Sequence, residues 1–124
     1  MTWHYGDVVM VGLDPTLGHE QKKRRPGVVV SSDEFNRHCT TTIVVPVSHG
    51  RGDFELHVPL TPTRLDDGSV LDGHAQVEHV RAMDLTACDA QLLGRLGEGD
   101  LEHITDMLLG CLVGPDTLIV PSGY

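Results

Sequence analysis

Short runs of apolar residues, rich in β-branched side chains, dominate the first half of the chain. Residues 8–13 and 27–30 are nearly continuous apolar runs, as expected for strands that are buried on both faces. Residues 40–47 form the strongest run, because threonine, isoleucine and valine favour extended structure. Residues 54–58 alternate between apolar and polar side chains, which is typical of a half-buried strand. The pattern therefore predicts a protein built mainly of β-strands.

Turn-forming residues separate these runs. Asp14 precedes a proline and ends the first run, because the residue before a proline leaves the helical region. Residues 59–68 form another loop, with two prolines and an Asp-Gly pair. Residues 70–71 and 75–85 are expected to form two further strands or one bent ribbon. Short strands at this spacing favour a barrel over alternating βαβ units.

One amphipathic helix is predicted over residues 100–113, where apolar side chains recur at i, i+3 and i+4 spacing. Gly99 or Asp100 is expected to cap its start, and Gly114 is expected to end it. A single helical turn is expected at residues 32–36, capped by its first or second residue. The apolar positions of the long helix are Leu101, Ile104, Leu108, Cys111 and Leu112.

Length and composition indicate a small cytoplasmic protein. The 124 residues fit one domain spanning residues 1–124. No apolar run approaches the roughly 18–20 residues that a membrane span needs. The first residues lack a charged region followed by an apolar core, so no secretory signal peptide is expected. Three cysteines without CxxC spacing are expected to be buried and reduced; they are Cys39, Cys88 and Cys111.

Charge is distributed unevenly along the chain. The net charge is −9 at pH 7, which argues against a general affinity for nucleic acid. Residues 1–52 nevertheless hold six Lys and Arg against five Asp and Glu, whereas the rest of the chain holds three against thirteen. Phosphate contacts are therefore expected in the first half. The densest basic run, a pattern that is equally typical of a solvated loop, is Lys22, Lys23, Arg24 and Arg25.

Motifs for metal and nucleotide chemistry are missing from the sequence. The histidines and cysteines show neither HExxH nor paired CxxC spacing, so no zinc site is expected. The glycines form no GxGxxG or Walker pattern, and no serine stands in a GxSxG elbow. We therefore expect an activity that needs no metal and no cofactor.

Three blocks of sequence follow one another in an order that is specific. In the first, Gly-His-Glu-Gln at residues 18–21 is followed by Arg-Arg-Pro at residues 24–26 and then by a valine-rich strand. The second block is Val-Val-Pro-Val-Ser at residues 44–48, and the third occupies residues 76–85. Together these blocks resemble those of the MazF/PemK (Kid-like) family of endoribonuclease toxins from type II toxin–antitoxin systems. The resemblance covers roughly residues 6–85.

The resemblance implies a fold, a chemistry and partners. The implied fold is mainly β with α, an SH3-like β-barrel of the PemK/MazF type with a C-terminal helix. The implied activity is sequence-specific cleavage of single-stranded RNA, mRNA in particular, without metal. The 2′-hydroxyl attacks the neighbouring phosphate and leaves a 2′,3′-cyclic phosphate and a 5′-hydroxyl. The implied partners are a second copy of the chain and a MazE-like antitoxin, and the apolar segment at residues 117–120 is expected to pack on the barrel or on that second copy.

Four residues carry the catalytic roles that the resemblance implies. Arg25 matches the catalytic arginine of the family, whose guanidinium clamps a phosphate. Ser48 stands where the family usually has threonine and keeps the hydroxyl. His19 matches a histidine that takes part in acid–base work or RNA contact. Glu78 stands where PemK-like members carry an acid–base aspartate.

The surroundings of these residues depart from the family at one position. Gln76 stands where PemK-like members have an arginine, so the charge that would hold the carboxylate of Glu78 is lost. Strand alternation is expected to place Gln76 and Glu78 on one face. The resemblance leaves Arg24 to electrostatic attraction alone, and Glu20 is expected to pair with a basic side chain. The candidates for substrate binding are Glu20, Lys22, Lys23, Arg24 and Gln76.

Two other functions remain open on the sequence alone. A non-catalytic barrel of the same fold would act as a binding or regulatory module, which Gln76, Ser48 and the acidic net charge favour somewhat. A DNA-binding barrel is disfavoured, because the predicted helix carries acidic residues and almost no cations. Arg25 separates the first two hypotheses, because only an enzyme has an activity to lose when it is replaced. Base stacking by Trp3 and Tyr5 would suit nucleic-acid binding, but core or interface packing of these rings is expected.

Overall fold

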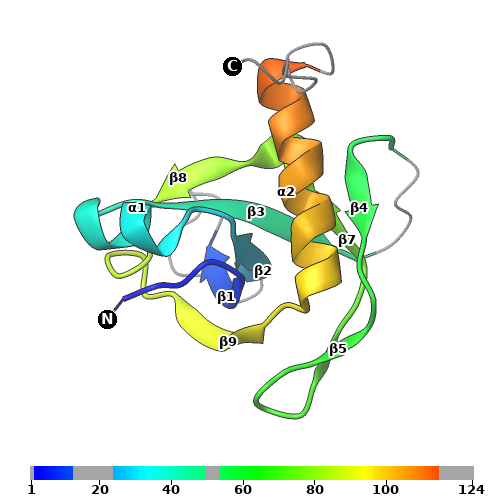
Figure 1. Cartoon of the computed structure of the whole chain (residues 1–124). Helices are drawn as coiled ribbons and strands as arrows, with labels where there is room; N and C mark the ends of the chain where they lie inside the picture. The colour runs from blue at the N-terminus through cyan, green and yellow to red at the C-terminus, as the bar shows by residue number, and fades with distance from the viewer. Residues whose placement is uncertain (1, 13–23, 50–53, 115–124) are drawn as a thin grey trace.

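A computed structural model of the chain describes residues 2–12, 24–49 and 54–114. Figure 1 shows its β-strands and helices. In chain order, the elements are β1 (Asp7–Gly12), β2 (Arg24–Val29), α1 (Asp33–His38), β3 (Thr42–Ser48), β4 (His57–Pro59), β5 (Thr63–Arg64), β6 (Val70–Leu71), β7 (His74–Gln76), the 3₁₀ turn η3 (Val77–His79), β8 (Arg81–Met83), β9 (Gln91–Arg95) and α2 (Glu98–Val113).

The main sheet is antiparallel and is organised around β3. Its strand order is β4-β7-β3-β2-β1-β9, and β8 also pairs with β3. The first part of β3 pairs with β8 and its last residues pair with β7. Among the described strands, β4 and β9 end the order without pairing with each other, so the sheet is not closed. The mainly β architecture with a C-terminal helix is confirmed, whereas the expected SH3-like barrel is confirmed only in part.

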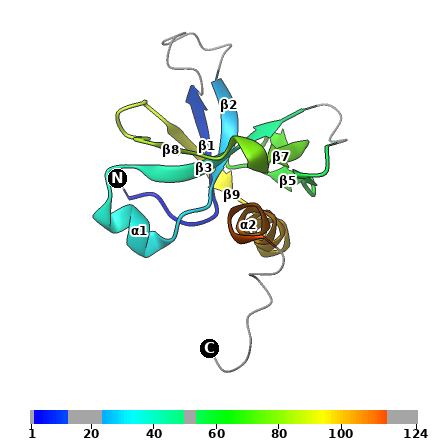
Figure 2. The same ribbon diagram turned by 90° about the horizontal axis from the view of Figure 1, so that it is seen from above.

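One hydrophobic core lies between the sheet and α2. Val8, Val28 and Val45 are in register across β1, β2 and β3, so their side chains form a row on one face. Leu101 and Ile104 of α2 are buried against the same cluster. Figures 1 and 2 show α2 lying along this side of the sheet. Full burial of each such side chain contributes about 1.5–3 kcal/mol, which explains why the helix is held there.

A second core lies on the opposite face of the same strands. Val29 and Val44 pair across β2 and β3 and are buried with Trp3 and Leu85. Val28, the neighbour of Val29, belongs to the first core. The prediction that the run at residues 27–30 is buried on both faces is therefore confirmed.

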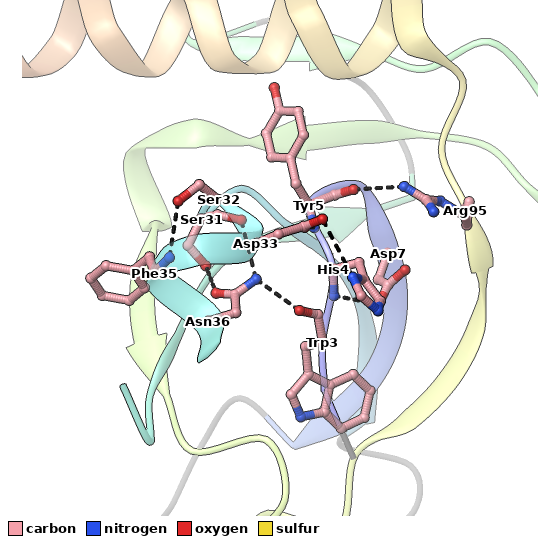
Figure 3. A network of polar contacts seen from close by, with 10 residues as sticks. All are labelled: Trp3, His4, Tyr5, Asp7, Ser31, Ser32, Asp33, Phe35, Asn36 and Arg95. Atoms are coloured by element: carbon pink, nitrogen blue, oxygen red, sulfur yellow. Dashed lines mark hydrogen bonds and ion pairs between the residues drawn. The ribbon is translucent and has the colours of Figure 1, made fainter. Parts of the chain in front are cut away.

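The segment before β1 is tied to α1 by a polar network, which Figure 3 shows. The Asn36 Nδ2 donates to the Trp3 carbonyl at 3.0 Å, and the Tyr5 N–H donates to the Asp33 carboxylate at 2.8 Å. This N–H lowers the pKa of the Asp33 carboxyl. Ser32 caps α1 by accepting a hydrogen bond from the N–H three residues later at 3.1 Å, as predicted. Trp3 is only 6% exposed, so its expected packing in the core is confirmed.

The start of α2 differs from the prediction, whereas its end agrees. Gly97 is the N-cap, not Gly99 or Asp100. The carboxylate of Asp100 instead accepts a hydrogen bond of 2.8 Å from the backbone N–H of Thr61. The helix therefore starts before Asp100. The glycines on either side of Glu98 do not indicate in the sequence where it begins. Gly114 ends the helix with a φ of 78°, a conformation that glycine adopts readily.

The apolar stripe of α2 is only partly covered. Leu101 and Ile104 are buried, but Leu112 is 68% exposed. The apolar positions predicted for this helix are therefore buried in its first half, whereas Cys111 and Leu112 near its end are exposed. No helix within the described ranges is long and apolar enough to cross a membrane.

The strand expected at residues 70–71 is confirmed as β6, but other short elements were not predicted. β5, which pairs with β6 in a separate ribbon, lies inside the loop expected at residues 59–68. β9 pairs with β1 and was not expected at all. The strand expected over residues 54–58 is reduced to β4, and Phe54 is 51% exposed in the turn before it. Strands this short leave too few residues for an alternating pattern to appear.

The prediction that the three cysteines are buried is wrong. Cys39, Cys88 and Cys111 are all exposed and free. Cys39 is the C-cap of α1, Cys88 lies in the turn before β9, and Cys111 lies near the end of α2. Each occupies an element end, where the chain is at the surface.

Candidate active site

Polar side chains of three neighbouring strands lie on one face of the sheet. β3 ends at Ser48, which pairs directly with His74 at the start of β7 and forms a row with it. The β2–β3 pairing ends at Gly27 and Pro46, two residues before Arg25. Arg25 pairs with Val11 of β1, which belongs to the second core, so Arg25 lies on that face of β2, the strand beside β3.

This row lies on the face of the sheet that points away from α2. Val47 and Ala75 pair across β3 and β7, and both are buried in the core beneath α2. Adjacent residues of a strand point to opposite faces. Ser48 and His74 therefore point to the other side, where the Ser48 Oγ donates a hydrogen bond of 3.2 Å to the carbonyl of His49.

A glycine allows β7 to approach the end of β3. Gly73 has a φ of +113°, which side chains rarely tolerate. A Cβ at this position would lie 2.2 Å from the carbonyl oxygen of Ser48. The contact between Ser48 and His74 therefore depends on a residue without a side chain at position 73.

An imidazole–carboxylate pair lies on the strands beside this row. Glu78 in η3 accepts a hydrogen bond of 2.7 Å from the Nε2 of His57 in β4. His79 is 3.8 Å from the same carboxylate oxygen. The side chain of His57 is 11% exposed and that of Glu78 is 24% exposed. The pair is therefore partly shielded, with the carboxylate still open to solvent.

The charge state of Glu78 follows from these contacts. Burial on its own raises the pKa of the Glu78 carboxyl. The hydrogen bond from His57 lowers this pKa. The backbone N–H of Glu78 and the charge interactions with His57 and His79 lower it further. The net result is a pKa below the ordinary glutamate value. These contacts therefore favour the carboxylate form of Glu78.

His57 also stacks on His74, which joins the pair to the row. The two ring centroids are 4.5 Å apart with an angle of 17° between the planes, and Phe54 meets His57 edge-on. The Nδ1 atoms of both histidines are buried without a hydrogen-bond partner among the described residues. Sequence reasoning missed both histidines as site residues, because the contact arises only from the pairing of β4 with β7.

Gln76 and Glu78 do not share a strand face, so that prediction is wrong. β7 ends at Gln76, and the next three residues form η3. Val77 is buried in the core beneath α2, and the chain turns around it. Gln76 is half-buried and pairs with His57 across β4 and β7. Both residues therefore lie beside His57: Gln76 through strand pairing, and Glu78 through the side-chain hydrogen bond.

No group of three or more His, Cys, Asp or Glu side chains in the described ranges is placed to hold a metal ion. The site combines a cation, a hydroxyl, a carboxylate and two imidazoles. A cation and a hydroxyl bind phosphate oxygens, and a carboxylate and an imidazole move protons. The arrangement therefore suits acid–base chemistry at a phosphate.

A family described as "PemK-like, MazF-like toxin of type II toxin-antitoxin system" matches residues 4–111 of this chain. The chain belongs to this toxin family. The match confirms the resemblance drawn from the sequence blocks. It also extends beyond residue 85, where those blocks end, and includes most of α2.

Individual relatives agree with this membership. The endoribonuclease toxin ChpB of Escherichia coli is 38% identical over 106 residues, which cover 84% of this chain and 86% of ChpB. A crystal structure of MazF from Deinococcus radiodurans has a TM-score of 0.73 at 26% identity, covering 92% of this chain and 98% of MazF. A MazE–MazF complex from the same organism has a TM-score of 0.72 at 20% identity, covering 92% of this chain and 97% of the matched chain. The whole described fold is therefore that of MazF-like toxins.

The two arginines of the RRP block have different surroundings in this toxin. Arg24 is half-buried, and its guanidinium donates to the carbonyls of Met10 and Asp89 at 3.0 and 2.6 Å. It thereby ties β1 to the turn before β9. Arg25 is exposed on the same face of the sheet as Ser48. Arg25 is therefore the better placed of the two for contact with a phosphate.

The remaining candidate residues lie outside the described residues of the toxin. They belong to the loop between β1 and β2, with the Gly-His-Glu-Gln motif and the first two cations of the basic run. The structure thus links Ser48, Gln76 and Glu78 through His57 and His74, and it places Arg25 on β2, the strand beside β3. The candidates outside the described ranges are His19, Glu20, Lys22 and Lys23.

Proposed function

We propose that this chain is a metal-independent, sequence-specific endoribonuclease that cleaves single-stranded RNA, with mRNA as its cellular substrate. Membership of the PemK-like, MazF-like family makes it an endoribonuclease toxin of a type II toxin–antitoxin system. The assignment of the site is supported by the positions of Arg25 and Ser48 on the neighbouring strands β2 and β3, on the face of the sheet opposite α2. A guanidinium and a hydroxyl suit two oxygens of one phosphate.

The proposed reaction is a transfer of the phosphate from the 5′-oxygen to the 2′-oxygen of the RNA. The 2′-oxygen attacks phosphorus while Glu78 accepts its proton. Arg25 and the Ser48 hydroxyl stabilise the charge that develops on the phosphate oxygens. The bond from phosphorus to the 5′-oxygen then breaks, and His19 supplies the proton to this leaving oxygen. The products are a 2′,3′-cyclic phosphate and a 5′-hydroxyl.

Substrate binding is assigned to the residues around this centre. Lys22 and Lys23 attract the RNA backbone through their charge. Arg24 holds the start of β2 and adds to the same positive field. Gln76 offers an amide beside His57 for a hydrogen bond to the RNA, and Glu20 orients one of the cations of its own loop.

We also propose partners for this toxin. The MazE–MazF complex noted above contains an antitoxin. By analogy, a MazE-like antitoxin would neutralise this chain by laying an acidic segment over the basic loop, where charge attraction aids binding. The active form would be a homodimer, and the site of action would be the cytoplasm, where mRNA is translated. The chain is proposed to form one domain over residues 1–124.

The first test is cleavage of a long single-stranded RNA by the purified toxin in excess EDTA, with Arg25→Ala beside it. We expect fragments with 5′-hydroxyl ends from the wild type, and a loss of rate of about 100-fold or more from the variant. Loss of transition-state stabilisation at the phosphate is the reason. Both proteins must first show the same oligomeric state and unfolding midpoint. No cleavage by the wild type on several RNAs would instead favour a non-catalytic binding module of the same fold.

A further inference from the structure

Within the described site, the side chain of His57 contacts both Glu78 and His74. Its Nε2 lies 2.7 Å from Glu78, and its ring stacks on His74, the strand partner of Ser48. We propose that His57 is a positioning residue for this toxin, which holds the Glu78 carboxylate oriented and ionised to accept the proton of the RNA 2′-hydroxyl. This inference rests on the proposed function and adds a residue that the sequence blocks did not mark.

The surroundings of His57 restrict where its ring can lie. One face stacks on His74, Phe54 meets the ring edge-on, and the side chain is only 11% exposed. A ring held in this way presents its Nε2–H in one direction, toward Glu78. A carboxylate that is fixed before substrate arrives loses less freedom when the reaction begins, which is how positioning lowers a barrier.

The stack also separates the positions of the two rings. Of the two, only His57 has a carboxylate within hydrogen-bond distance, that of Glu78, whereas His74 lies beside Ser48. The other titratable groups placed against His57 or Glu78 among the described residues are His74 on β7 and His79 on η3.

A hydrogen-bond donor at this place compensates for the absence of a cation at position 76. Gln76, which pairs with His57 across the strands, is uncharged and does not neutralise a carboxylate. His79 lies 3.8 Å from Glu78 and is 56% exposed, which is too far for a hydrogen bond and open to screening. His57 is therefore the group that holds Glu78 among the described residues.

The test replaces the donor while keeping the ring. His57→Phe preserves an aromatic ring for stacking and removes Nε2–H, and His57→Gln restores an amide donor near the same position. We expect kcat to fall about 10- to 100-fold in His57→Phe with little change in KM, and to recover partly in His57→Gln. Loss of the hydrogen bond raises the pKa of Glu78, so the acid limb of the kcat/KM profile moves to higher pH. His79→Gln, on the same carboxylate but without the hydrogen bond, is the matched control and should change kcat less than about twofold.

Two further comparisons separate this inference from the proposed function. In a Glu78→Gln background, His57→Phe should have no additional effect, because the group that it positions is gone. If Arg25→Ala abolishes cleavage but His57→Phe leaves rate and pH profile unchanged, the function stands and the inference is overturned. If the wild type does not cleave RNA, the function fails first. The ¹³C titration of the Glu78 carboxyl in wild type and His57→Phe then still shows whether His57 holds that carboxylate, and an unshifted titration overturns the inference independently.

Discussion

The hydroxyl of Ser48 is the smallest functional group of the proposed site, and it is free to bind a phosphate oxygen. Its one hydrogen bond among the described residues is a long contact of 3.2 Å to a backbone carbonyl. We expect Ser48→Ala to lower the single-turnover rate about 10- to 100-fold, because one donor to the charged phosphate is removed. Ser48→Thr keeps the hydroxyl and should retain activity within about threefold. A wild-type rate in Ser48→Ala would remove Ser48 from the mechanism.

The same site shows what a residue type can and cannot reveal by itself. Arg25 and Ser48 were predicted from the sequence because each lies in a short block that resembles the MazF/PemK family. His57 and His74 lie in no motif, and 16 residues separate them along the chain. Their stacking exists only because β4 pairs with β7. A contact that depends on strand register has no local signature, so these two rings required the structure.

At the scale of elements, the site depends on how closely the start of β7 approaches the end of β3. Gly73 permits this approach through its positive φ and its missing side chain. We expect Gly73→Ala to lower the free energy of unfolding by more than about 3 kcal/mol, because the added methyl collides with backbone that cannot move aside. Urea unfolding measures this loss.

A second glycine provides the control for that experiment. Gly68 also has a positive φ of +88°, but no heavy atom lies within 4 Å of its added Cβ. Gly68→Ala should therefore lower the free energy of unfolding only through the unfavourable backbone conformation, by about 1–2 kcal/mol. Equal losses in Gly68→Ala and Gly73→Ala would show that the close approach to Ser48 contributes nothing.

The elements differ in how far the sequence predicts them, and burial explains the difference. β1, β2 and β3 carry valines toward two cores, so their apolar runs are unmistakable. β9 is an edge strand whose buried position is Gly94, while Leu92 is 42% exposed, and its register shifts against β1. A strand is usually recognised by apolar residues at its buried positions, and here the buried position is a glycine while a leucine is exposed. β5 has only two residues, too few for any period to appear, whereas the strand expected at residues 70–71 is present as β6.

At the scale of the whole molecule, the toxin must bind a polyanion while carrying a net charge of −9. The acidic residues are concentrated after residue 52, whereas the basic run precedes β2 and continues into it. RNA should therefore approach from the side of the β1–β2 connection, and the acidic remainder should repel it elsewhere. The same asymmetry would allow an acidic antitoxin segment to compete for that side.

This distribution predicts a small and localised salt dependence. On single strands, each phosphate contact contributes about 0.7 to the slope of log affinity against log salt. We expect the double replacement Lys22→Ala and Lys23→Ala to raise KM and to reduce this slope by about 0.7 for each lysine, with kcat within about twofold. Arg64→Ala, which removes an exposed cation on β5, should leave the slope unchanged. An equal fall of the slope in the lysine variant and in Arg64→Ala would mean that RNA is held by the overall charge and not by the basic run. A large loss of kcat in the lysine variant would instead place those lysines at the reacting phosphate.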